Sequence, residues 1–97
     1  MIREMVFVDV LPEHHDEFEA AVARAVESSL SPSEGFIDFV LARGVERPNT
    51  YSMIINWETL EDHTVGFRES ERFVTWRELI GPFFAVAPTV DHWTPLG

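Results

Sequence analysis

The chain has 97 residues, with 17 acidic and seven basic side chains and a formal net charge of −10. It contains neither cysteine nor lysine, which excludes disulfides, thiolate metal sites and thiol nucleophiles. We expect no nucleic acid and no anionic membrane as partner, because phosphate binding depends on clustered Lys and Arg. We expect a single cytoplasmic domain over residues 1–97, since no stretch approaches the ~20 apolar residues of a membrane span.

The first elements are a strand and a helix. Residues 2–11 are rich in β-branched and aromatic side chains, and from Met5 onward apolar residues occupy both alternating sets. This pattern predicts a strand that is covered on both faces. Pro12 then favours the first turn of a helix, whose apolar residues recur at intervals of three or four until about Ser29.

The middle of the chain predicts a β-hairpin. A second strand is expected over 35–44, a turn cluster occupies 46–50, and a third strand runs over 50–57. A second helical region follows, capped by Thr59 and interrupted near Ser70. A short strand over 87–94 closes the chain.

The resulting order, βαββαβ, predicts an α+β ferredoxin-like fold with an antiparallel four-stranded sheet and helices on one face. One sheet face is then bare in a monomer. Residues 5–8 and 53–55 nevertheless place apolar side chains on both faces of the inner strands. We therefore expect a homodimer in which a second copy of the chain covers the bare face.

Several motifs carry a family resemblance. The run from Tyr51 to His63 is a strand that ends in Trp57-Glu58 and turns at once into a helix. It is followed by Phe67, Ser70-Glu-Arg-Phe73, Trp76, Pro82-Phe-Phe84 and the closing run Pro88 to Trp93. Together these resemble the antibiotic biosynthesis monooxygenase (ABM) family over nearly the whole chain. The resemblance implies a dimeric α+β barrel with a ligand cleft between the sheet and the helices of each subunit.

The resemblance also points to residues on the third strand. In family members that oxidise anthrone-type aromatics, an Asn and a Trp four residues apart act in the cleft, with a Tyr six residues after the Trp. Trp57 matches that Trp, whereas Met53 stands at the Asn position and His63 at the Tyr position. Since strand residues alternate, Tyr51, Met53 and Trp57 should share the cleft side, and Asn56 should point to the partner sheet.

A cofactor-free oxygenase needs an acid–base group, a hydrogen-bond donor and an apolar box around its substrate. We expect Trp57 to be the donor and His63, whose ordinary pKa lies near neutrality, to be the base. Asp9 is the other candidate base, because a carboxyl group buried in a strand has a raised pKa. The alternatives are a packing role for Trp57, a solvated His63 and a strand-end ion pair or plain exposure for Asp9.

The expected ligand is a small aromatic molecule. The expected substrate-binding residues are Tyr51, Met53, Phe67 and Trp76. We therefore interpret the chain as a monooxygenase that acts on a phenolic, anthrone-like or quinol substrate without metal or flavin. The alternative is a non-catalytic homodimer that binds an aromatic ligand or has a regulatory role, which the departures at Met53 and His63 favour.

Histidines elsewhere predict no metal site. His14 and His15 are neighbours on a helix and point about 100° apart, so they do not chelate one ion. Asp91 and His92 are neighbours on the last strand and face opposite ways, so that one of them could line the cleft; we favour a surface position. In the haem-degrading branch of the family, the position of the iron-binding His corresponds to Arg77, so we expect no haem chemistry.

Overall fold

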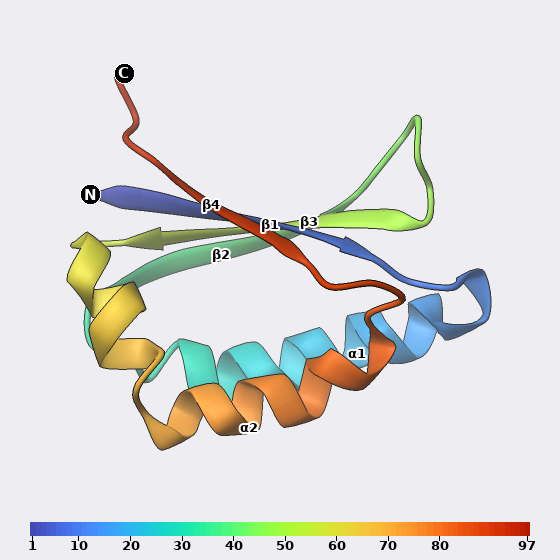
Figure 1. The fold of residues 1–97 in the computed structure, drawn as a ribbon, viewed down its shortest axis with the longest axis horizontal. Helices are drawn as coiled ribbons and strands as arrows, with labels where there is room; N and C mark the ends of the chain where they lie inside the picture. Colours follow the sequence, from blue (N-terminus) through green and yellow to red (C-terminus); the bar gives the residue numbers. More distant parts are fainter.

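Four strands form one antiparallel sheet, and both main helices lie on the same face of it (Figure 1). The structure is a computed structural model that describes all residues, 1–97. The elements are β1 (Ile2–Asp9), α1 (His15–Ala25), β2 (Phe36–Arg43), β3 (Thr50–Trp57), α2 (Glu71–Ile80) and β4 (Thr89–Trp93). Shorter helical turns are Pro12–His14 and Gly81–Phe83, of the 3-10 type, and Val26–Leu30 and Asp62–Phe67, of the π type.

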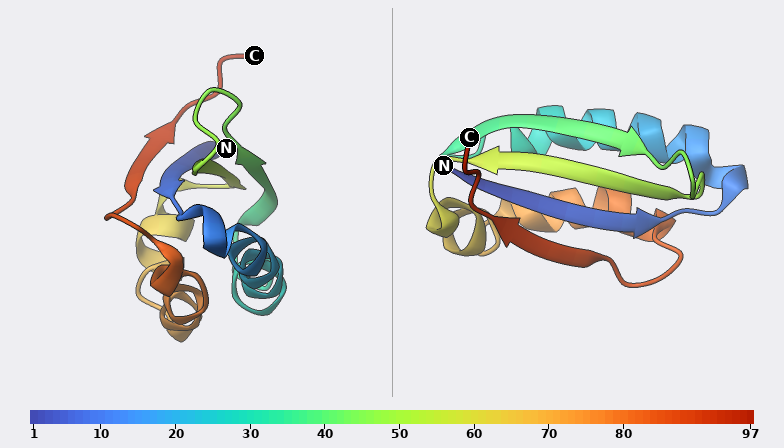
Figure 2. Two further views of the ribbon diagram at one scale, coloured as in Figure 1. Left: turned by 90° about the vertical axis from the view of Figure 1, so that its right-hand side faces the viewer. Right: turned by 90° about the horizontal axis from the view of Figure 1, so that it is seen from above.

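The strand order is β2-β3-β1-β4, with every neighbour antiparallel. Figure 2 shows this order from above the sheet, with the helices behind it. It confirms the predicted ferredoxin-like α+β fold. The central pair β1·β3 sets Val6 opposite Met53 and Glu4 opposite Ile55, while β4 sets His92 opposite Glu4.

Three element boundaries differ from the sequence prediction. β1 ends at Asp9 rather than at residue 11, because the chain leaves the sheet to enter the Pro12 turn. The regular part of α1 ends at Ala25, and a wider turn continues it to Leu30. β4 begins at Thr89 because Pro88 has no backbone N–H to donate to a neighbouring strand.

The hydrophobic core lies between the sheet and the helices. It is built from alternate residues of β1 and β3 and from one face of α1. Its largest fully buried members include Trp57, Tyr51, Phe18, Leu30 and Met53. Burying a side chain of this kind stabilises the fold by about 1.5–3 kcal/mol. The opposite sheet face has no helix over it, and Phe7, Val40 and Trp93 are exposed there.

Gly35 fixes the start of the helical region after β3. Its φ of +80° is in the left-handed region, and a Cβ there would collide with the carboxylate of Asp62. The carbonyl of Gly35 accepts the Glu58 N–H at 2.8 Å. Thr59 caps the segment as predicted, since its hydroxyl accepts the Asp62 N–H at 3.1 Å. These contacts hold the following residue, His63, against the end of the sheet.

Candidate active site

A cavity of about 890 Å³ lies between the sheet and α2. This volume is within the range of small-molecule sites. Most of its walls are apolar. The apolar lining includes Met53, Ile55, Phe67, Trp76, Ile80 and Phe84. Its charged or titratable lining residues are Glu4, His63, Arg68, Arg77 and Glu78.

Glu4 is the buried carboxyl group of this cavity. It lies on β1 in the alternation of Val6 and Val8, so its side chain points toward the helices, and it is only 6% exposed. Desolvation raises the pKa of Glu4 to about 7, against the opposing effects of a hydrogen bond from Trp57 and the charge of Arg68. A carboxyl group that titrates near neutral pH in an apolar cavity is a recognised sign of a proton-transfer site.

Trp57 holds Glu4 in place. Its indole Nε1–H donates to Glu4 Oε1 at 3.0 Å, and the ring is fully buried. Trp57 does not line the cavity, so it reaches a ligand only through Glu4. The only side-chain hydrogen bond to Glu4 is at Oε1, which leaves Oε2 without a side-chain partner.

His63 lies beside this pair. Its Nε2 is 3.4 Å from Glu4 Oε1, and its ring stacks on Trp57 with a centroid distance of 5.4 Å. Burial lowers the pKa of His63 to about 3, with smaller contributions from the positive charges of Arg68 and His92. His63 is therefore neutral at neutral pH. Glu4, not His63, is the group of this cluster whose pKa lies near 7.

His92 joins the cluster from β4. Its Nε2 lies 2.7 Å from His63 Nδ1, a hydrogen bond between the two rings. The surface placement expected for His92 is corrected: the register opposite Glu4 turns its side chain to the helix side of the sheet, where it is half-buried. Burial and Arg68 lower its pKa, against the opposing effect of Asp91.

Three of the four expected substrate-binding residues line the cavity, namely Met53, Phe67 and Trp76. Phe67 contacts the ring of Trp76 edge-on at 6.3 Å, which makes a continuous aromatic wall. Met53 faces this wall from the sheet. Such a box suits a flat apolar ligand.

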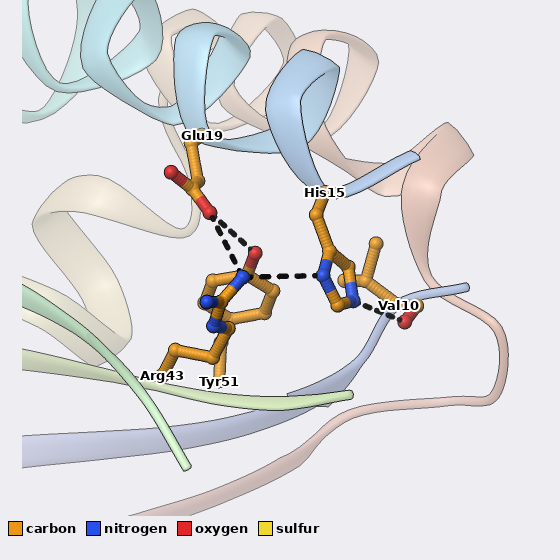
Figure 3. A network of polar contacts seen from close by, with 5 residues as sticks. All are labelled: Val10, His15, Glu19, Arg43 and Tyr51. Atoms are coloured by element: carbon orange, nitrogen blue, oxygen red, sulfur yellow. Dashed lines mark hydrogen bonds and ion pairs between the residues drawn. The ribbon is translucent and has the colours of Figure 1, made fainter. Parts of the chain in front are cut away.

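Tyr51, the fourth, lies outside the cavity. Its hydroxyl donates to Glu19 of α1 at 2.6 Å, and Arg43 and His15 complete the network drawn in Figure 3. Burial and Glu19 raise the pKa of Tyr51 to about 12. Its phenol is thus committed to joining β3 to α1 rather than to a ligand.

Asp9 is also away from the cavity. It is exposed at the end of β1 and accepts a hydrogen bond from the Thr50 hydroxyl at 2.7 Å. Exposure at the end of a strand was one of the alternatives that the sequence left open for Asp9. Asp9 and Thr50 face the side of the sheet that carries no helices.

Sequence reasoning missed Glu4 and Arg68. The available signal for Glu4 was a lone carboxylate at the start of an apolar alternation, in register with Val6 and Val8. Arg68 immediately follows the π-helical turn that carries His63, and neither it nor Arg77 has a carboxylate within 4 Å. No group of three or more His, Asp or Glu side chains converges to hold a metal ion. None of the helices has the length and apolar character that crossing a membrane requires.

Comparison with known proteins identifies the family. Residues 1–79 match the family model described as antibiotic biosynthesis monooxygenase. The chain belongs to the ABM family. A relative of the ABM chain is the uncharacterized protein YczJ of Bacillus subtilis (strain 168), 36% identical over 93 residues, which cover 96% of this chain and 97% of YczJ.

Solved structures agree with this ABM assignment. A candidate antibiotic biosynthesis monooxygenase from Bordetella bronchiseptica superposes with a TM-score of 0.92 at 36% identity, covering 98% of this chain and 96% of that one. A Streptomyces coelicolor monooxygenase from the gene ActVA-Orf6, solved in complex with the ligand Nanaomycin D, has a TM-score of 0.85 at 17% identity, covering 99% and 88%. The second likeness shows the shared fold. Membership of the ABM family supports a monooxygenase-like function.

Proposed function

We propose that this chain is a cofactor-independent monooxygenase that oxidises a small phenolic, anthrone-like or quinol substrate. The observation that carries the proposal is Glu4, a buried carboxyl group with a pKa of about 7 in a cavity with apolar walls. Its carboxylate has the basicity to remove an acidic proton at neutral pH. The volume and aromatic lining of the cavity suit a substrate of one to three fused rings.

Glu4 takes the role of base that the sequence suggested for His63 or Asp9. Glu4 Oε2 receives the substrate proton, while Trp57 and His63 hold Oε1. Arg68 lines the cavity and supplies a positive charge that favours a substrate oxyanion. Met53, Phe67 and Trp76 form the apolar box around the rings.

For an anthrone-like substrate, the proposed reaction accounts for every atom and electron. Glu4 removes one proton from the ring methylene, and the resulting carbanion is stabilised by conjugation with the ring carbonyl. The carbanion bonds to dioxygen and gives a peroxide anion, which takes the proton back from Glu4. The O–O bond then breaks as the remaining C–H proton is lost, which leaves a ring carbonyl and one water molecule. Dioxygen is the oxidant.

The test is dioxygen consumption by chelator-treated protein offered an anthrone and a panel of quinols. Glu4→Gln keeps the shape of the side chain and removes the base, so uptake should fall at least ~100-fold. Glu46→Gln, on the exposed β2–β3 loop, is the matched control and should keep wild-type uptake. Circular dichroism checks that both variants fold.

Full uptake in folded Glu4→Gln would overturn the proposal. Ligand binding without uptake across the panel would instead favour the alternative, a non-catalytic protein with an aromatic-ligand pocket. The substitution of Met for the family Asn at position 53 is the feature that favours this second function. Fluorescence titration with the same compounds measures the binding.

The bare face of the sheet supports a homodimer. Phe7, Val40 and Trp93 are exposed there by 36%, 53% and 54%. Beside them Arg3 donates to Asn56 at 3.1 Å, and Asn56 donates to Asp38 at 2.6 Å. Apolar side chains around a satisfied polar centre are typical of a surface that another protein covers. A second copy presents the same surface, so one two-fold axis buries both.

A further inference from the structure

The side chains of Glu4, His63 and His92 form a continuous line from the cavity to the edge of the sheet. Glu4 Oε1 is 3.4 Å from His63 Nε2, and His63 Nδ1 is 2.7 Å from His92 Nε2. His63 is 2% exposed, whereas His92 on the edge strand β4 is half-buried and meets solvent. His63 contacts its neighbours through both ring nitrogens, and His92 contacts His63 through Nε2. The two rings thus connect a buried carboxyl group with water.

We propose that Glu4, His63 and His92 form a proton relay that exchanges the carboxyl proton of Glu4 with solvent, and so restores the carboxylate that starts each turnover. The inference rests on the role proposed above for Glu4 and extends it to two residues that touch no substrate atom in that mechanism. In this geometry the two imidazoles act as positioning and relay groups. Trp57, which donates to the same carboxyl oxygen, fixes the inner end of the line.

The proton transfer from Glu4 to water leaves the imidazole rings of His63 and His92 uncharged. When Glu4 carries a proton on Oε1, that O–H donates to His63 Nε2, and His63 Nδ1–H donates to His92 Nε2. As Glu4 loses its proton to His63 Nε2, the Nδ1 proton of His63 passes to His92 Nε2. His92 then releases its own Nδ1 proton to water. Glu4 becomes a carboxylate, and both histidines end as the opposite neutral tautomers.

The surroundings favour this neutral exchange. Burial and Arg68 disfavour a positive charge on His63, and the same two causes lower the pKa of His92, opposed by Asp91. Arg77 and Glu78 of α2 also line the cavity that Glu4 faces. A stable imidazolium at His63 would stop the relay, because the proton would stay there. The 3.4 Å gap at Glu4 is slightly long for a hydrogen bond, as catalytic contacts often are before a ligand binds.

The relay predicts that the tautomers of His63 and His92 follow the charge of Glu4. Long-range ¹⁵N–¹H NMR spectra of the intact protein, recorded in steps between pH 5.5 and 8.5, identify which ring nitrogen carries the proton. Below a pH of about 7, His63 should carry its proton on Nδ1, and above it on Nε2. His92 should switch from Nδ1–H to Nε2–H over the same pH range.

Two variants make the test decisive. In Glu4→Gln, His63 and His92 should each keep one tautomer across the whole range, while the signals of the more distant His14 match those of wild type. In Trp57→Phe, the pKa of Glu4 should rise because a hydrogen bond to its carboxylate is lost, and the tautomer change should move to higher pH with it. The second variant keeps the test available if the first does not fold.

A single His63 tautomer on both sides of the Glu4 titration would overturn the relay. So would a tautomer change that persists unaltered in Glu4→Gln. The readout requires no substrate and no turnover. Failure of the relay is therefore distinguishable from failure of the proposed oxygenation, which is measured by dioxygen uptake alone.

Discussion

Glu4 Oε1 and His63 Nε2 lie 3.4 Å apart, yet the two side chains do not form an ion pair. The pKa of Glu4 is raised to about 7 and that of His63 is lowered to about 3, so both are neutral between these values. Above pH 7 Glu4 is ionised while His63 remains neutral. The cavity therefore gains one negative charge as pH rises through about 7, on the carboxyl group of Glu4.

Trp57→Phe tests whether Trp57 acts through Glu4. The indole N–H lowers the pKa of Glu4, so its removal should raise that pKa above 7. Turnover should fall roughly three- to tenfold at pH 7, on the scale of tenfold per pKa unit, and recover at higher pH. The check is the pH profile of kcat/KM. An equal loss at every pH would show instead that the N–H acts directly on the substrate.

Tyr51→Phe should separate stability from activity. The variant loses the hydroxyl that donates to Glu19 at 2.6 Å but leaves the cavity lining intact. We expect the free energy of unfolding to fall by about 1 kcal/mol, since Glu19 stays partly hydrated. Dioxygen uptake should stay within about twofold of wild type if the phenol only joins β3 to α1. A large loss of uptake without a loss of stability would assign Tyr51 to the substrate.

The stability of the protein should depend on Glu4 in a defined direction. Its pKa is raised from 4.5 to about 7 on folding, so the folded state binds more protons between these values. Stability should therefore decrease as pH rises through this window, by up to about 3 kcal/mol relative to Glu4→Gln. Urea unfolding of both proteins at pH 4.5 and pH 8, at equal concentration, provides the comparison. His63 contributes the opposite slope between about pH 3 and 6.5 in both proteins. A wild-type protein that becomes more stable relative to Glu4→Gln as pH rises would contradict the burial of Glu4.

Arg68→Met should change the titration of all three relay groups together. The positive charge of Arg68 lowers the pKa of Glu4, His63 and His92. Its removal should therefore raise all three values, as measured by NMR titration. Arg72→Met, exposed on α2 and outside the cavity lining, is the matched control and should change none of them. Unchanged titrations in Arg68→Met would place its guanidinium away from the cluster.

Val40→Asp should weaken the proposed dimer. Val40 lies on the bare sheet face and is 53% exposed. An unpaired carboxylate buried at the interface should raise the dissociation constant at least ~100-fold, which corresponds to roughly 3 kcal/mol. Sedimentation equilibrium measures this change. Val45→Asp, in the β2–β3 loop and 88% exposed, is the control that should leave association unchanged. A wild-type protein that sediments as a monomer would remove the dimer.

Hydrophobic periodicity in the sequence was enough to predict the fold. The alternation in β1 and β3 and the three-to-four spacing in the helices gave all four strands and both helices in the right order. Alternation also placed Tyr51, Met53 and Trp57 on the helix side, and all three are buried there. These predictions succeeded because one face of each element must be removed from water.

The site was harder to predict because a shared face does not identify the neighbours along it. Tyr51 and Met53 are two residues apart on one side of β3, yet α1 covers the first and the cavity opens at the second. Glu4 was missed because its raised pKa comes from burial, which depends on Trp57 and on segments over 50 residues away in the chain. The prediction placed His92 at the surface because the side of the sheet to which its side chain points depends on the register between β4 and β1.

The Tyr51 network and the Glu4 cluster lie at opposite ends of β3. Tyr51 and Trp57 are six residues apart, which corresponds to about 20 Å along an extended strand. The two clusters share no side chain and no hydrogen bond. Free-energy changes at sites this distant are usually additive. Substitutions at Glu19, Arg43 or His15 should therefore change the stability of the protein and leave the acid–base chemistry at the other end as it is.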